Sequence, residues 1–362
     1  MMRSRAVRES SLSVKGEFMY IVLTILMFGM LIFIHELGHF TMARIFKVPV
    51  KEFAIGMGPR ILSRTSKKYG TVYALRLFPF GGFVSMEGEG EESESEDAYS
   101  KKPNWQRVLI LLAGPTMNII LAIVMMFGLV LSSEYLLSTT VGAFVEGSVS
   151  SEEGGLQVKD KIVKVGWVPV FSGDELIYEI SMQGSEPVDI TVIRDGKEIV
   201  LNDVKFGVVT EKGVSLGTCD FRVYAEEKTV GNCLKQATTR SISSFKMVID
   251  SLGGLLTGKF GIDAVQGPVG VTGEIQELEN QGLMTFSTFV YLAVIISMNL
   301  GVFNLLPIPA LDGGQILFRI IEAVRGGKPL KPETENAING VMLILLLIFS
   351  VFIMIKDIIG LF

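Results

Sequence analysis

Four long apolar stretches constrain the fold of this chain more than any other feature of its sequence. They occupy residues 19–46, 108–132, 284–306 and 340–362 and contain few charged side chains. Each is long enough to cross about 30 Å of hydrocarbon as a helix. Backbone inside a bilayer must satisfy its own hydrogen bonds, which a helix does. We therefore expect a polytopic α-helical membrane protein with four transmembrane helices.

The first stretch also allows a second interpretation, as a secretory signal peptide. Basic residues precede its apolar run, as in a signal peptide, namely Arg3, Arg5, Arg8 and Lys15. No small-residue cleavage site follows, and polar residues interrupt the run. We favour a membrane span at 19–46, which makes residues 1–18 an N-terminal extension.

The overall composition excludes several other classes of protein. Of the 362 residues 49% are apolar, and the net charge of −5 lacks the basic excess of a nucleic-acid-binding surface. Cys219 and Cys233 are too few for a disulfide scaffold, and we expect them to be unpaired.

The distribution of basic residues predicts the orientation in the membrane, because Lys and Arg accumulate on the cytoplasmic side. Eleven of them lie between the first two spans, counting Arg44, and four lie at 315–339. The opposite side has five, leaving out the long middle segment. We expect 47–107 and the loop 315–339 in the cytoplasm, with both termini outside. Seven acids among residues 87–97 indicate a mobile linker.

The middle segment has the composition of a soluble α+β domain, inserted between the second and third spans. Residues 139–209 alternate like short strands, and Asp195-Gly196 is typical of a hairpin turn. We expect a helix at 172–182. The expected strands lie at 141–145, 161–165, 188–194 and 198–201. Residues 210–283 form a connecting region whose amphipathic stretch, 230–256, either lies along the membrane or caps the domain.

The chemistry of the chain concentrates where the first span ends. Its only two histidines stand in the sequence His35-Glu36-Leu37-Gly38-His39. Positions four apart share one helix face, so both imidazoles can bind one zinc ion, and Glu36 can take a proton from an acidified water. Chance spacing is the alternative, but it arises in roughly 0.5% of random placements. Ionisable groups inside a span are also costly unless they are paired or hydrated.

A catalytic zinc site usually has three protein ligands, so one more is needed. Asp312 is the best candidate, because it follows the third span and the spans are nearly free of acids. Pro307 and Pro309 forbid a continuous helix there, which predicts a broken helix that turns the carboxylate toward a polar cavity. We take 284–314 as the third span with this ligand. The alternative is that Asp312 caps a following helix at 315–324, a role that does not exclude ligation.

Five sequence motifs, in order along the chain, resemble those of the bacterial site-2 proteases of the RseP type, which are intramembrane zinc metalloproteases with a PDZ domain. The resemblance covers nearly everything after residue 18. The matching segments are His35 to Phe40 with the zinc motif, 53–59 with a Gly-x-Gly segment, 79–84 with a hairpin on the cytoplasmic side, 113–118 with a second-span motif and 304–314 with a third-span motif.

The resemblance implies roles for individual residues. It makes His35, His39 and Asp312 the zinc ligands and Glu36 the general base. Asn299 and Asn304 would hold substrate backbone or the transition-state oxygen.

The same resemblance implies a cell context. It places the enzyme in the bacterial inner membrane with its active site near the cytoplasmic side. Its partners would be single-span membrane proteins, such as anti-sigma factors, and leftover signal peptides.

Residues 139–209 are similar to one extracytoplasmic PDZ domain, which would contact the substrate or act as a size filter. Lys159 stands where the PDZ pattern has glycine, so the conformation of that turn and peptide capture by the domain stay open.

Residues 73–84 predict a membrane-associated β-hairpin whose unpaired strand edge extends the substrate by main-chain hydrogen bonds. The substrate-contacting candidates are Tyr73, Leu75, Leu77 and Phe80. The alternative is a purely structural hairpin under the first span. Asn118, in the second span, either orients a metal ligand or bonds a neighbouring helix.

Two rival functions follow from the same residues. One is a non-catalytic, membrane-anchored PDZ adaptor with a structural zinc site, which would need a fourth protein ligand. The other is a metal transporter, for which a single ion site without further intramembrane acids is weak support.

Overall fold

The computed structural model describes residues 2–91, 93–211 and 214–360 and divides into two compact units. The first unit comprises the chain up to Ala122 and from Gln266 onward, and the second comprises Ile123 to Val265. Helix α2 begins in the first unit and continues into the second.

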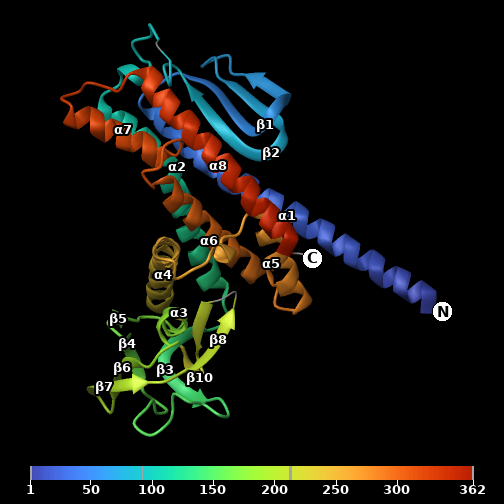
Figure 1. Cartoon of the computed structure of the whole chain (residues 1–362), viewed down its shortest axis with the longest axis vertical. Coiled ribbons are helices and arrows are strands. Elements are labelled where there is room, and N and C mark those ends of the chain that lie inside the picture. The colour runs from blue at the N-terminus through green and yellow to red at the C-terminus, as the bar shows by residue number, and fades with distance from the viewer. Residues whose placement is uncertain (1, 92, 212–213, 361–362) are drawn as a thin grey trace. The chain divides into compact units, whose positions relative to one another are not determined.

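The first unit is built from helices and one β-hairpin (Figure 1). Among the described residues four helical segments are long and apolar enough to cross a membrane, which confirms the prediction of four spans. They are Ile21–Ile45 within α1 (Met2–Ile45), α2 (Asn104–Ser132), α6 (Phe286–Asn304) and α8 (Pro332–Gly360). The shorter helices are η1 (Tyr99–Lys101), α5 (Pro268–Asn280) and α7 (Asp312–Val324).

The break between α6 and α7 lies where the two prolines predict it. Pro307 and Pro309 lack a backbone N–H and cannot continue a helix, so α6 ends at Asn304. The chain then makes a short turn and starts α7 at Asp312, with Leu311 in the N-cap position.

The β-hairpin consists of β1 (Val50–Thr65) and β2 (Val72–Met86), and it lies beside the C-terminal part of α1 (Figure 1). Both strands bend back on themselves, so Phe53 lies opposite both Val84 and Tyr73. Gly56 and Gly58 allow the bend in β1, because their φ angles of 84° and 83° favour glycine. Residues 50–55 are therefore flanked by 82–86 on one side and 72–75 on the other.

An ion triad stabilises the bent hairpin. Glu52 is buried and accepts hydrogen bonds from Arg60 and Arg76, and Arg76 also donates to the carbonyl of Gly58 at 2.6 Å. Burial raises the pKa of Glu52, but the hydrogen bonds from the two guanidinium groups outweigh it and leave the pKa below its usual value.

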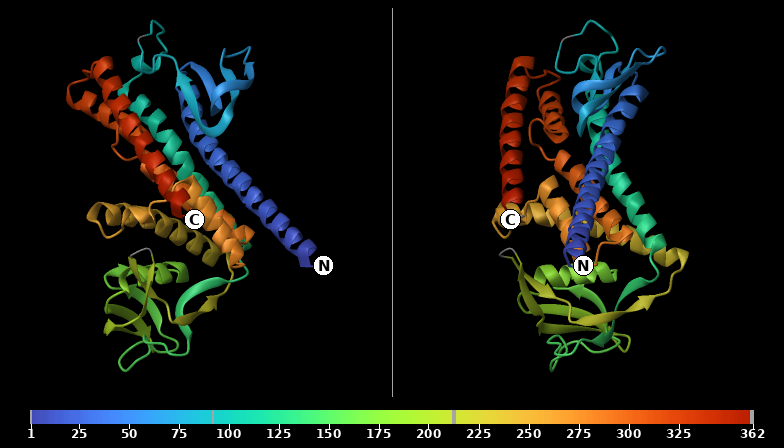
Figure 2. Two further views of the ribbon diagram at one scale, coloured as in Figure 1. Left: turned by 45° about the vertical axis from the view of Figure 1, so that its right-hand side comes forward. Right: turned by 90° about the vertical axis from the view of Figure 1, so that its right-hand side faces the viewer.

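In both views of Figure 2 the hairpin, α7 and the segment between β2 and α2 gather at one end of the first unit. The first turns of α1 and the last described turns of α8 lie away from that end.

The second unit has an antiparallel sheet with the strand order β10-β3-β4-β6-β7 and a separate β8–β9 hairpin, and β5 pairs with β4. The strands are β3 (Leu136–Phe144), β4 (Lys161–Val165), β5 (Val168–Pro169), β6 (Val188–Arg194), β7 (Lys197–Val204), β8 (Gly207–Glu211), β9 (Val214–Thr218) and β10 (Phe221–Glu226). Its helices are α3 (Gly173–Gln183), α4 (Val230–Thr257) and the short η2 (Ile262–Ala264).

Local signals explain several elements of this unit. Asp195 and Gly196 both have positive φ angles, 52° and 77°, as a tight turn between β6 and β7 requires. Ser172 caps α3, since its side chain accepts a hydrogen bond from the amide of Glu175. Lys159 adopts a φ of 76°, so its turn keeps the left-handed backbone that glycine usually provides.

The sheet extends beyond the expected domain limit at residue 209. Strand β10 pairs with β3, and Phe221 belongs to the buried core together with Ile162, Ile180 and Ile190. The sequence interpretation placed β10 in a connecting region, although Phe221, Val223 and Ala225 stand at alternate positions, as in a half-buried strand. Cys219 and Cys233 are both free thiols.

Candidate metal centre

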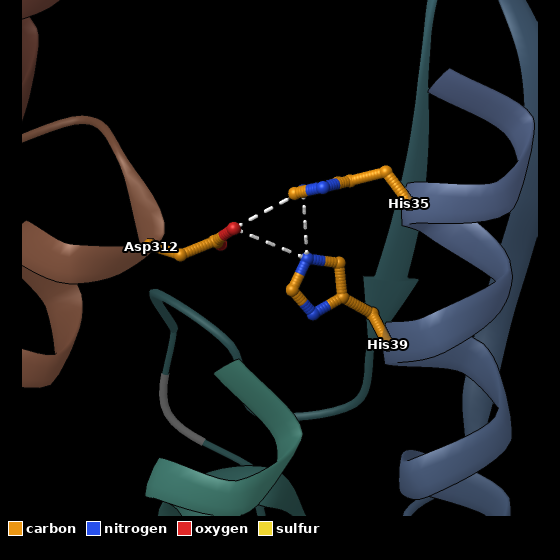
Figure 3. A group of neighbouring side chains, drawn as sticks. All are labelled: His35, His39 and Asp312. Carbon is orange, nitrogen blue, oxygen red and sulfur yellow. Dashed lines mark hydrogen bonds and ion pairs between the residues drawn. The ribbon is translucent and has the colours of Figure 1, made fainter. Parts of the chain in front are cut away.

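The centre starts from two histidines on successive turns of α1. The imidazoles of His35 and His39 are buried, and their Nε2 atoms are 3.2 Å apart (Figure 3). The four-residue spacing places both on the helix face turned toward α2 and α7.

Asp312 brings the third ligand atom from a distant part of the chain. Its Oδ2 lies 3.1 Å from Nε2 of His35 and 3.4 Å from Nε2 of His39. In Figure 3 the three side chains point toward one another. Asp312 is the first residue of α7, and Leu311 occupies the N-cap position, so the carboxylate faces the histidines and does not cap the helix.

The donor atoms fit a zinc ion. Three atoms bound tetrahedrally at about 2.0–2.1 Å would lie about 3.3 Å apart, close to the three observed separations. Oδ2 of Asp312 is buried and has no hydrogen-bond donor among the described residues. Two neutral imidazole nitrogens and one carboxylate are also a common ligand set of catalytic zinc. The predicted cofactor is thereby supported by the chemistry of the residues themselves.

Two glycines allow α1 and α2 to approach closely enough to form this centre. A Cβ atom on Gly114 would lie 2.3 Å from Nε2 of His39 and 2.8 Å from Nε2 of His35. A Cβ atom on Gly38 would lie 2.4 Å from the carbonyl oxygen of Ala113. Any side chain at Gly114 would therefore enter the space between the ligands.

Helix α2 also contacts the far side of each imidazole. Nδ1 of His39 lies 2.8 Å from the carbonyl oxygen of Ile110, to which it donates a hydrogen bond. This bond leaves Nε2 of His39 unprotonated and free for a metal ion. Nδ1 of His35 lies 3.3 Å from the side-chain amide of Asn118.

A cavity of about 440 Å³ opens over the ligands. Glu36 lines it beside His35, His39 and Asp312, and Asn304 lines it from the end of α6. Gly82, Phe83 and Val84 of β2 form another part of its wall.

A second cavity of about 490 Å³ shares part of this wall. The residues common to both are Glu89, Leu111, Ala310, Leu311 and Asp312. Its other walls carry an ionic network in which Arg319 bonds both Glu322 and Glu335, and Glu322 pairs with Arg107. Part of the Glu89 side chain is exposed, but loss of solvent at the cavity wall raises the pKa of its carboxyl group to about 7.

The structure separates the remaining predicted site residues. Asn304 lines the metal cavity, whereas Asn299 is half-buried in α6 and is not among the lining residues. Tyr73 and Leu75 line a different, apolar cavity between α1 and the hairpin, and Leu77 is exposed. The side chain of Phe80 lies outside the described residues.

The hairpin residues that reach the metal cavity are Met57, Gly81, Gly82, Phe83, Val84 and Met86. Four of them, Gly81 to Val84, lie in the predicted substrate-binding segment 73–84, but none is among the four substrate-contacting candidates. The pair Gly81-Gly82 was the available signal, since a wall that approaches a catalytic cavity closely needs small residues. Glu89 was also missed, because it lies in an acidic run that reads as a solvated linker.

These observations define the class of the protein. Two histidines and a glutamate in the spacing HExxH, an aspartate that completes a zinc site, and four membrane-long helices describe a zinc metalloprotease that is a multi-pass membrane protein.

Comparison with known proteins agrees with this class. The pattern of peptidase family M50 matches residues 23–349, and the chain belongs to this family. A Fusobacterium nucleatum protein designated a zinc metalloprotease is 34% identical over 95% of this chain and its own entire length. A similarly designated Clostridium acetobutylicum protein is 33% identical over 95% of this chain and 98% of its own length. The regulator of sigma-W protease RasP of Bacillus subtilis is 30% identical over 91% of this chain and 96% of its own length.

The protein is therefore a site-2-type intramembrane zinc metalloprotease, as the motifs predicted. Zinc is its cofactor, and His35, His39 and Asp312 form the metal site.

Proposed function

We propose that this enzyme hydrolyses peptide bonds within the transmembrane segments of single-span membrane proteins. The observation that carries the proposal is that Glu36 and all three metal-ligating side chains line one cavity of the helical unit that contains the spans. The Bacillus subtilis relative is by its name a regulator of sigma-W, which supports membrane proteins of sigma-factor control as substrates.

Each residue then has a defined task. Zinc held by His35, His39 and Asp312 would supply Lewis acidity and lower the pKa of a bound water to about 7. Glu36 accepts the proton of the attacking water and passes it to the leaving amine. Asn304 offers a side-chain N–H for the transition-state oxygen, since its Nδ2 uses one hydrogen in a 2.9 Å bond to the carbonyl of Leu300 and has a second.

The substrate must be extended, because a helix hides its amide bonds. We assign this task to the strand segment 82–86, which pairs with 50–55 along one edge. Its other edge runs along the metal cavity, where Gly82, Phe83 and Val84 form the wall. Main-chain hydrogen bonds along such an edge hold a substrate with little dependence on its sequence.

Water reaches the ligands through the second cavity. Its charged walls, with Arg107, Arg319, Glu322 and Glu335, hold water where lipid would exclude it. The basic residues of 47–107 and 315–339 support a cytoplasmic position for this end of the first unit. The enzyme then lies in the bacterial inner membrane with both termini and the second unit outside.

The second unit serves as one PDZ domain that filters substrates by size. Its support is a sheet covered by one capped helix, α3, and the left-handed turn at Lys159, which keeps the backbone of the usual glycine. Substrates with trimmed outer segments should be cleaved faster than the same spans with folded outer domains. Equal cleavage rates for the two kinds of substrate by the intact enzyme would contradict a size filter.

The decisive experiment compares wild type, Glu36→Gln and Glu227→Gln on a model single-span substrate in detergent or vesicles. Glu36→Gln should abolish cleavage and keep its zinc, because Glu36 is not a ligand. Glu227→Gln makes the same substitution at an exposed position of the second unit and should change neither cleavage nor zinc content. Retained turnover in Glu36→Gln would refute the proposed mechanism.

A further inference from the structure

We propose that Asn118 is a positioning residue for the zinc ligand His35, holding the imidazole in the tautomer whose Nε2 is free to bind zinc. The inference rests on the zinc-protease function above and goes beyond it by assigning a role to a residue that touches neither metal nor substrate.

The first step is the contact itself. Asn118 lies in α2, is completely buried, and its side-chain amide is 3.3 Å from Nδ1 of His35. A neutral imidazole that binds metal through Nε2 carries its proton on Nδ1. Nδ1 of His35 is then a donor, and only an acceptor atom satisfies it.

The second step is the orientation of the amide. With Nδ2 toward His35, Oδ1 of Asn118 is buried and has no hydrogen-bond partner among the described residues. Turning the amide by 180° exchanges the two atoms and breaks no other hydrogen bond, because among the described residues Oδ1 makes none and Nδ2 contacts only His35. Oδ1 then accepts the Nδ1–H of His35, so zinc binding and the turned amide favour each other.

The third step is the matching arrangement at the other histidine. The carbonyl oxygen of Ile110, two turns earlier in α2, accepts a hydrogen bond from Nδ1 of His39 at 2.8 Å. Helix α2 thus faces the outer nitrogen of both imidazoles. A backbone carbonyl cannot turn to become a donor, whereas the amide of Asn118 can, so His35 is the ligand whose tautomer depends on a side chain.

The competing role of Asn118 is to join helices. Its backbone carbonyl accepts a hydrogen bond of 2.8 Å from Oγ of Ser297 in α6, and Ser297 is itself completely buried. That bond uses the backbone of Asn118 and leaves its amide to His35. The two roles therefore separate by mutation.

The test measures zinc affinity by competition with a chelator, together with the visible spectrum of the cobalt-substituted enzyme. Asn118→Leu keeps the branched shape of the side chain and removes the acceptor, so zinc should bind about 10- to 100-fold more weakly, the usual effect of removing a partner of a ligating histidine. Asn118→Asp keeps an acceptor and should restore most of the affinity and the wild-type cobalt spectrum. Ser297→Ala, the matched control, should leave zinc affinity unchanged.

Thermal unfolding of the zinc-free variants completes the test. Ser297→Ala and Asn118→Leu should both unfold within a few degrees of wild type. A reduced zinc affinity then cannot be attributed to an unfolded protein. Unchanged zinc affinity in Asn118→Leu would overturn the proposal. Equal loss in the Leu and Asp variants, or equal loss in Ser297→Ala, would also overturn it and assign Asn118 to helix packing. Each of these outcomes leaves the role of Glu36 untouched, because zinc binding is measured without substrate.

Discussion

Asp357 in α8 caps the start of α5 at Gly267, with its Oδ2 2.8 Å from the Gly267 amide nitrogen. The same oxygen accepts the amide of Gly270 at 3.0 Å. The buried carboxylate of a membrane span is thus paired with backbone donors that α5 leaves free at its N-terminus. This side chain therefore links α8 to the N-terminus of α5.

Removing this cap should destabilise the first unit. Asp357→Leu should lower the free energy of unfolding by about 1–3 kcal/mol, because two amides lose a charged acceptor. Asp357→Asn keeps one acceptor oxygen and should lose less. The thermal midpoint in detergent measures both, and a Leu variant as stable as wild type would contradict the capping role.

Gly114 should tolerate no side chain. In Gly114→Ala the new Cβ would stand 2.3 Å from Nε2 of His39, so the ligands must move apart. We expect zinc content and cleavage to fall at least tenfold while the protein still folds. Gly128→Ala is the matched control in the same helix, since nothing lies within 4 Å of a Cβ there. Full zinc loading of Gly114→Ala would contradict this prediction, because the histidines would then accommodate the added Cβ atom.

Asp312 should be needed for metal retention. Asp312→Ala should lose zinc during dialysis against a weak chelator, whereas Glu36→Gln retains it. In the wild type zinc affinity should decline as pH falls, because protons compete with the metal ion for its ligand atoms. Metal analysis across pH 5–8 checks both points. Stable zinc in Asp312→Ala would exclude the aspartate from the ligand set.

Asn339 should support the loop that delivers Asp312. Ala310 has a φ of 72°, which is strained for a residue with a side chain, and its amide donates to Oδ1 of Asn339 at 3.0 Å. Asn339→Ala should weaken zinc binding by about fivefold, the equivalent of one hydrogen bond. Ala310→Gly removes the strain and should raise the thermal midpoint. If both variants match wild type, the loop does not depend on these two features.

Glu89 should produce a pH dependence of stability. Its pKa of about 7 lies above the ordinary carboxyl value, so between pH 4.5 and 7 the folded state binds more protons than the unfolded state. Stability should therefore fall as pH rises through this window. Glu89→Gln should flatten that decline, as measured by thermal midpoints at pH 5, 6 and 7. Parallel curves for the two proteins would contradict the raised pKa.

The sequence alone determined the local features of this protein. Hydrophobic length predicted the four spans, the spacing of His35 and His39 predicted a shared metal face, and Asp195-Gly196 predicted a hairpin turn. It also named Asp312 as the third ligand, but by elimination, because few acids stand near the spans. Patterns of this kind work because helix and strand geometry repeats over a few residues.

The tertiary structure alone decided which distant residues meet. It brought Asp312 to the two histidines, put Gly82 to Val84 rather than Tyr73 and Leu75 at the metal cavity, and paired β10 with β3. It also placed Asn118 beside His35. Such contacts depend on how whole elements pack and on where glycines let them approach, and no local periodicity encodes that packing.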